Sequence, residues 1–186
     1  MDGNNKTDRV LAPVVALLLS ALMLPAAARA SAPELSEPMQ RLEPFIGTWD
    51  CREKYHAGGW VEEDMVVPGV DRIAIGPGGH YLEASYHSEA AWGPYVGQGY
   101  MYWDPAAEVY RFHWYDSMAP VPQLAAGDWK AGKLVFEHQA TQGGKQVTMR
   151  RTYEIVSADR VDLQLQAVHP DGTVQTLMSM AKTRRR

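Results

Sequence analysis

From Gly47 to the end of the chain, apolar and polar residues alternate in short segments that turn sequences separate. Alternation with a period of two is typical of a β-strand that buries one face. The clearest such segments are 95–103, 109–115, 145–156 and 160–168. The sequences between them are rich in Gly, Pro, Asp and Ser, which favour tight turns. The pattern predicts roughly nine or ten strands joined by hairpins.

Antiparallel strands in this number usually close into a barrel or pack as a sandwich, because either arrangement hides the strand edges. We expect an all-β fold, an antiparallel up-and-down barrel of about ten strands with one short N-terminal helix. Ser36 is placed to cap that helix, which would extend through Phe45 with Pro38 in its first turn. We assign the barrel domain to residues 38–186, where no repeat or internal boundary is visible.

The first thirty residues have the organisation of a secretory signal peptide. Lys6 and Arg9 form a basic start, residues 10–24 are largely apolar, and an A-x-A cleavage site ends at Ala30. The apolar run is shorter than the ~20 residues that a bilayer span needs, which disfavours the alternative of an uncleaved anchor. We expect cleavage near Ala30, a flexible lead-in over 31–37, and a periplasmic or secreted protein without a stable membrane anchor.

Charge and cysteine content restrict the partners further. The chain has 18 basic and 22 acidic residues, and loss of residues 1–30 leaves a net charge of −5. A mildly acidic surface is a poor match to nucleic acid, so no nucleic-acid partner is expected. Cys51 is the single cysteine, which excludes an internal disulfide. No feature of the sequence specifies an oligomer.

Alternation also assigns side chains to the barrel interior. The first strand directs Trp49, Cys51, Glu53 and Tyr55 inward, with polar neighbours outward. Two later strands direct inward Leu134, Phe136 and His138, and Val147, Met149, Arg151 and Tyr153. The last strand places on one face Val174, Met178, Met180, Lys182 and Arg184. The predicted interior is therefore mostly apolar, but it contains three ionisable residues, Glu53, His138 and Arg151.

Unpaired buried charge is costly, so these three groups have two interpretations. In the first, Glu53 and Arg151 form a structural pair and His138 is a hydrogen-bonded core residue. In the second, all three line a cavity and orient a small apolar or amphipathic ligand, with an acidic group if Arg151 is unpaired. The candidate ligand-binding residues are Trp49, Glu53, Tyr86, Trp114, His138, Met149 and Arg151.

Several short motifs carry a resemblance to known families. Residues 42–49, with Gly47-Thr48-Trp49, resemble the opening of calycin-type barrels such as lipocalins and nitrobindins. Residues 38–184 are similar to a family of exported bacterial proteins of unknown function with a lipocalin- or nitrobindin-like barrel. The motifs that carry this similarity are Gly97-Gln98-Gly99, Trp103-Asp104, Trp114-Tyr115-Asp116-Ser117-Met118 and Thr183-Arg184. Trp103 departs from the tyrosine usual in that family.

The resemblance implies a fold and structural roles for Gly47, Trp49 and Arg184, but no activity. By analogy with lipocalins, Arg184 stacks on the indole of Trp49 and closes one end of the barrel. The nitrobindin analogy also raises haem as an alternative cofactor, with His138 and then His87 as axial candidates. Asp50-Cys51-Arg52-Glu53 replaces the glycine-rich continuation of nitrobindins, so we expect no cofactor.

Other chemistry is weakly represented. The six histidines form no metal-binding spacing and G-x-S-x-G does not occur, so we assign no metal ligand and no catalytic residue. An acid/base enzyme remains an alternative if Glu53 and His138 share one cavity. Trp60, Trp92 and Trp129 lie near predicted turns. They either belong to the rim of the barrel or form a docking surface. The leading hypothesis is a small-molecule-binding barrel; the alternative is an interaction module with a filled core.

Overall fold

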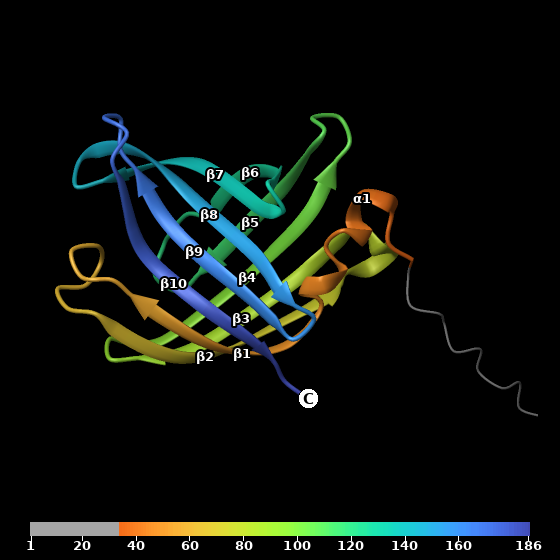
Figure 1. Ribbon diagram of the computed structural model, residues 1–186, viewed down its shortest axis with the longest axis horizontal. Coiled ribbons are helices and arrows are strands. Elements are labelled where there is room, and N and C mark those ends of the chain that lie inside the picture. Colours follow the sequence, from red (N-terminus) through yellow and green to blue (C-terminus); the bar gives the residue numbers. More distant parts are fainter. Residues whose placement is uncertain (1–33) are drawn as a thin grey trace, which may run out of the picture. The chain divides into compact units, whose positions relative to one another are not determined.

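The computed structural model describes residues 34–186, so the predicted signal peptide and its cleavage site lie outside the described residues. Within residues 34–186, ten antiparallel strands form a closed barrel in which β10 returns to pair with β1 (Figure 1). The strands are β1 (Gly47–Tyr55), β2 (Met65–Ile75), β3 (Tyr81–Ala90), β4 (Gly93–Asp104), β5 (Val109–Asp116), β6 (Gln123–Lys130), β7 (Lys133–Gln142), β8 (Lys145–Ser157), β9 (Arg160–Val168) and β10 (Val174–Arg184). The predicted all-β up-and-down barrel is confirmed.

The predicted short N-terminal helix is present, but it ends before Phe45 and a 3-10 turn follows it. Helix α1 (Glu37–Gln40) is followed by a 3-10 turn, η1 (Glu43–Phe45), and the Ser36 side chain makes no capping hydrogen bond. Figure 1 shows this segment against one end of the barrel. Phe45 is buried and packs edge-on against the ring of Tyr153, with 5.5 Å between centroids. The segment therefore contributes core residues that fill this end of the barrel.

Trp49 and Arg184 complete the closure at the same end. Trp49 donates from Nε1 to the Phe45 carbonyl at 2.8 Å, and the Arg184 guanidinium lies 4.2 Å from the centre of the Trp49 ring. Arg184 also donates to the carbonyls of Ile46 and Pro44, at 2.5 and 3.0 Å. Gly47 has a φ of 145°, which favours glycine, and any Cβ there would meet the guanidinium.

The interior follows the predicted alternation on most strands, with one correction on β10. Met178, Met180 and Lys182 are buried, but Val174 is 50% exposed. The register between β9 and β10 shifts between Thr176 and Met178, and Leu177 is buried as well. A bulge of this kind adds a residue and reverses the facing of the positions before it.

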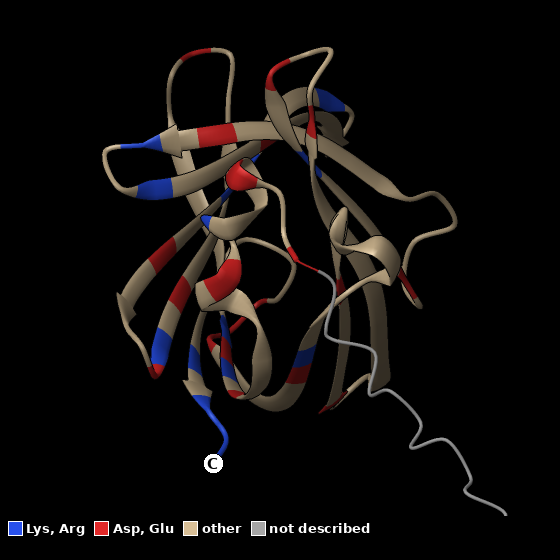
Figure 2. Cartoon of the chain, turned by 90° about the vertical axis from the view of Figure 1, so that its right-hand side faces the viewer, with Lys and Arg blue, Asp and Glu red and all other residues tan. Residues whose placement is uncertain are grey.

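The outer surface carries charged residues of both signs along the strands and hairpins (Figure 2). Some form cross-strand pairs, such as Lys133 with Glu154 and Arg150 with Glu137, each at 2.6 Å. None of the helices within residues 34–186 has the length and apolar character to cross a membrane.

Candidate functional site

Two cavities lie within the barrel and share four wall residues: Glu53, Tyr95, Arg151 and Met178. The inner chamber has a volume of about 50 Å³, and its other walls include Asp71, Tyr86, Phe112, Trp114 and Lys182. The mouth cavity has a volume of about 520 Å³, and its other walls include Tyr55, Trp60, Trp92, Met118, Gln123 and Leu165. The connections β1–β2, β3–β4 and β5–β6 supply part of these walls, so the larger space lies at the end opposite α1.

A buried ion pair occupies the inner chamber. Lys182 Nζ donates to Asp71 Oδ2 at 2.5 Å, with the two side chains 5% and 6% exposed. Burial opposes the charged ammonium, but the surrounding groups, Asp71 foremost, together outweigh it and raise the pKa of Lys182 above its usual value. Asp71 Oδ1 is buried without a hydrogen-bond partner among the described residues. Sequence reasoning missed Asp71, although it shares its facing with the apolar Val67 and Ile73 of β2.

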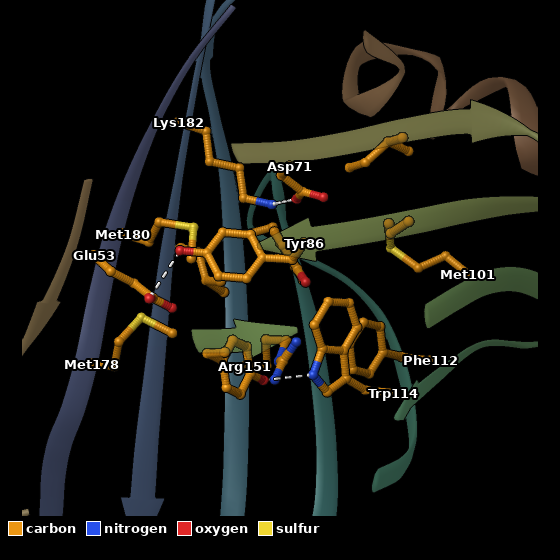
Figure 3. A pocket seen from close by; sticks show the side chains of 15 residues that line it. Glu53, Asp71, Tyr86, Met101, Phe112, Trp114, Arg151, Met178, Met180 and Lys182 are labelled. Carbon is orange, nitrogen blue, oxygen red and sulfur yellow. Dashed lines mark hydrogen bonds and ion pairs between the residues drawn. The ribbon is translucent and has the colours of Figure 1, made fainter. Parts of the chain in front are cut away.

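Glu53 lies in the same interior, held by two tyrosines. Its Oε2 accepts a hydrogen bond from the hydroxyl of Tyr86 at 2.9 Å (Figure 3). It also accepts one from the hydroxyl of Tyr55 at 3.1 Å. Burial raises the pKa of Glu53 above its ordinary value, while the two tyrosine hydrogen bonds act in the opposite direction. The site therefore favours a proton on this carboxyl more than water does.

Arg151 stands at the junction of the two cavities. Its guanidinium lies 4.3 Å from the centre of the Phe112 ring and 5.8 Å from that of Trp114 (Figure 3). It donates to Gln123 Oε1 over a long 3.4 Å. No ion pair of Arg151 occurs within residues 34–186, so the Glu53–Arg151 pair of the first interpretation is not formed. Strands β9 and β10 separate the strands that carry these two residues.

The Gly-x-Gly motif of β4 makes room for the Trp114 ring. Gly97 and Gly99 lie beside Trp114 on the neighbouring strand, and a Cβ at either position would overlap the indole. The indole therefore lies flat against the inner surface of β4, and its Nε1 donates to the Tyr95 hydroxyl at 2.9 Å. The motif that suggested the family thus positions an aromatic wall and a tyrosine of the site.

Three candidates lie away from both cavities. Trp49 belongs to the closed end, and Met149 is buried as the cross-strand partner of His138 without lining either cavity. His138 is half-buried in a groove beside β5 and β6, where burial and the Arg151 charge lower its pKa. Glu53 and His138 therefore do not share a cavity, contrary to the arrangement that the acid/base hypothesis requires.

The two histidines considered as haem ligands do not line the barrel interior. His138 lines neither interior cavity, and His87 is exposed on β3, where its Nε2 lies 3.1 Å from Glu89. Neither histidine is therefore placed to act as an axial haem ligand in the inner chamber or the mouth cavity. Within residues 34–186, no group of three or more His, Cys, Asp and Glu side chains is arranged to hold a metal ion.

Trp60 and Trp92 are functional candidates that the sequence placed only near turns. Both line the mouth cavity, and both pack against Tyr55, with ring centroids 6.3 and 5.2 Å away. Trp129 lies at the other end, beside Phe45 and under Arg41. The filled-core alternative predicted no ligand-sized space; the barrel is packed around its centre, but its mouth holds such a space.

Comparisons with known proteins agree with this fold. Residues 34–184 match a family described as a protein of unknown function (DUF1579). The structure of Rv2717c from M. tuberculosis is similar with a TM-score of 0.59 and 16% identity, over 82% of this chain and all of that one. The S-type phycobiliprotein lyase CPES from Guillardia theta is similar with a TM-score of 0.51 and 13% identity, over 81% and 92% of the two chains. None of the curated proteins matches the sequence.

Proposed function

The chain belongs to the DUF1579 family of proteins of unknown function, and from its interior we propose that it binds a small amphipathic molecule in the barrel mouth. The observation that carries the proposal is the mouth cavity of about 520 Å³. Pockets for small molecules are typically ~300–1,000 Å³ and combine apolar walls with a few polar groups. Here Trp60, Trp92 and Leu165 supply apolar surface, while Arg151 and Gln123 supply polar groups.

The structural neighbours are compatible with this role without naming a ligand. One of them is a phycobiliprotein lyase by name, so a barrel of this shape accommodates that activity in another protein. At 13% identity the likeness concerns the fold alone, and the ligand of the present chain has to be argued from its own residues.

We also propose that the protein acts outside the cytoplasm. The support is the sequence of residues 1–30, with its basic start, apolar run and A-x-A site. Fractionation of expressing cells, followed by N-terminal sequencing, tests this. A mature protein that begins at Ser31 is expected, and a cytoplasmic chain that retains Met1 would refute export.

Binding can be measured with N-phenyl-1-naphthylamine, an uncharged aromatic probe whose fluorescence rises in apolar surroundings. We expect saturable binding to the full chain. Ala119→Trp places an indole at the wall of the mouth cavity and should weaken that binding. Ala106→Trp is the matched control, because Ala106 is equally exposed but lies in the β4–β5 turn at the other end.

The proposal fails if the probe does not bind, or if both tryptophan variants bind it as the unaltered protein does. Native mass spectrometry of the gently purified protein provides a second measurement. A bound mass that leaves on denaturation would identify the natural ligand.

A further inference from the structure

The polarity of the mouth cavity changes with depth. Its outer wall is largely apolar and aromatic, with Trp60 and Trp92 at the hairpin connections, and its polar members are Asp116 and Gln123. Its inner limit, shared with the inner chamber, carries Glu53, Tyr95 and Arg151. An amphipathic molecule that matches this gradient has its polar group at depth and its apolar part toward the rim.

Two hydrogen-bond donors at this inner limit lack a strong acceptor. Among the hydrogen bonds within residues 34–186, Arg151 has only the 3.4 Å contact with Gln123, and a guanidinium carries five N–H groups. The Tyr95 hydroxyl accepts from Trp114 Nε1, and the hydrogen bonds within residues 34–186 give its own proton no acceptor. A guanidinium beside a free hydroxyl is complementary to an acceptor-rich anion.

The other charged groups nearby already have partners. Glu53 Oε2 accepts from two tyrosines, and Lys182 is paired with Asp71. Asp116, on the mouth wall, accepts from the backbone N–H groups of Met118 and Ala119 at 2.9 Å and from Gln123 at 3.4 Å. Lys182 thus has an anionic partner, whereas Arg151 is a cation at the junction with no ion pair to residues 34–186.

The inner chamber limits the size of the polar group. Its volume of about 50 Å³ accommodates a few water molecules, since each needs ~10–15 Å³ of such space. It does not accommodate a chain or a ring. A head group that reaches Arg151 must be small and must end there.

We propose that the ligand is an amphipathic monoanion that enters head-first. Its carboxylate or sulfonate accepts hydrogen bonds from Arg151 and Tyr95 in place of Gln123, and its apolar part fills the mouth between Trp60 and Trp92. This inference rests on the proposed function, because it specifies the ligand class of the same cavity.

A matched pair of probes separates the two ideas. 1-Anilinonaphthalene-8-sulfonate differs from N-phenyl-1-naphthylamine by the sulfonate alone. We expect both to bind the full chain. Arg151→Met should weaken binding of the sulfonate probe about tenfold or more, the cost of a lost charged hydrogen bond, and should weaken binding of the neutral probe much less. Tyr95→Phe should weaken the sulfonate probe severalfold, and Trp92→Ala should weaken both probes.

The outcomes distinguish the two proposals. If neither probe binds the unaltered protein, the proposed function fails. If the neutral probe binds but the sulfonate probe does not, or Arg151→Met leaves the affinity for the sulfonate unchanged, the head-first site is overturned and the cavity stands. Equal loss of both probes in Arg151→Met, with an intact near-UV circular dichroism spectrum, would also overturn it. If Arg151→Met fails to fold, Tyr95→Phe, which keeps the aromatic ring, provides the test. Unchanged affinity of Tyr95→Phe for the sulfonate probe would then overturn the head-first site.

Discussion

Lys182 and Asp71 form an ion pair across β1, deep in the barrel interior. Lys182 lies opposite Cys51 on the β10 side, and Asp71 lies opposite Trp49 on the β2 side. The two side chains meet at 2.5 Å over the inner surface of the strand between them. The pair therefore connects β2 with the last strand, β10, across the first strand, at the place where the barrel closes.

Removal of one member of this pair should be strongly destabilising. Lys182→Met leaves the Asp71 carboxylate buried without a counter-charge, and we expect the free energy of unfolding to fall by about 3–5 kcal/mol. Urea unfolding followed by circular dichroism measures this loss. Lys133→Met, in the exposed pair with Glu154, is the control and should cost less than about 1 kcal/mol.

A double variant tests whether the loss comes from the stranded charge. Asp71→Leu combined with Lys182→Met replaces the pair with apolar groups and should recover most of the stability. If the double variant is as unstable as the single one, the pair stabilises the fold through its specific geometry, and the stranded carboxylate is not the cause of the loss.

Glu53 should make stability depend on pH in a direction opposite to that of most carboxylates. Burial raises its pKa in the folded state above 4.5, so the folded protein binds more protons than the unfolded chain just above that pH. Stability contributed by this group is fully present below pH 4.5 and is lost as pH rises through the folded pKa. Glu53→Gln removes the titration and keeps an acceptor for Tyr55 and Tyr86.

We therefore expect the stability of Glu53→Gln relative to the unaltered protein to increase as pH rises from 4 to 8. Urea midpoints at several pH values provide the measurement, and Glu63→Gln, in an exposed loop position, is the control. A difference that does not vary with pH would show that Glu53 titrates alike in both states.

Period-two alternation was sufficient to predict the barrel and the inward facing of Glu53 and Arg151, because a strand with one buried face has few alternatives. It could not predict partners, since alternation gives the facing of a side chain and not its neighbours around the barrel. Glu53 and Arg151 belong to β1 and β8, which are not adjacent. Asp71, two strands from Lys182, was visible only as an acidic residue in phase with Val67 and Ile73.

Local irregularities caused the other differences. The bulge on β10 moved Val174 outward, and no glycine or proline near Thr176 announces it. His138 has the same parity as Leu134 and Phe136, but the pairing of β7 with β6 ends at Glu137. Beyond Glu137, β6 no longer covers the inner face of β7. A residue of β7 with the inward alternation is therefore not necessarily buried there.

Cys51 should be chemically silent in the folded protein. It is buried on β1, and burial raises the pKa of its thiol to about 12. At pH 8 the thiolate fraction is then ~10⁻⁴, against ~0.1 for an unfolded chain, so alkylation by iodoacetamide should be roughly a thousandfold slower. Mass spectrometry with and without urea gives both rates. Rapid alkylation of the native protein would mean that β1 opens locally.

Arg184 should resist conservative replacement at the closed end. Its guanidinium lies over Trp49 and donates to carbonyls of Pro44, Ile46 and Ala158, which joins the N-terminal segment, β10 and the β8–β9 turn. A lysine keeps the charge but has neither the planar surface nor the fork of donors. We expect Arg184→Lys to lower the free energy of unfolding by about 2 kcal/mol, from the carbonyls left without donors.

Arg160→Lys is the matched control, because Arg160 forms an exposed pair with Asp162 and should leave the urea midpoint unchanged. Binding of N-phenyl-1-naphthylamine should be retained in Arg184→Lys below its unfolding transition, since the mouth cavity lies at the opposite end. Equal midpoints for the two lysine variants would mean that the charge of Arg184 suffices to close the barrel. Loss of probe binding in the folded variant would instead show that the two ends of the barrel are coupled.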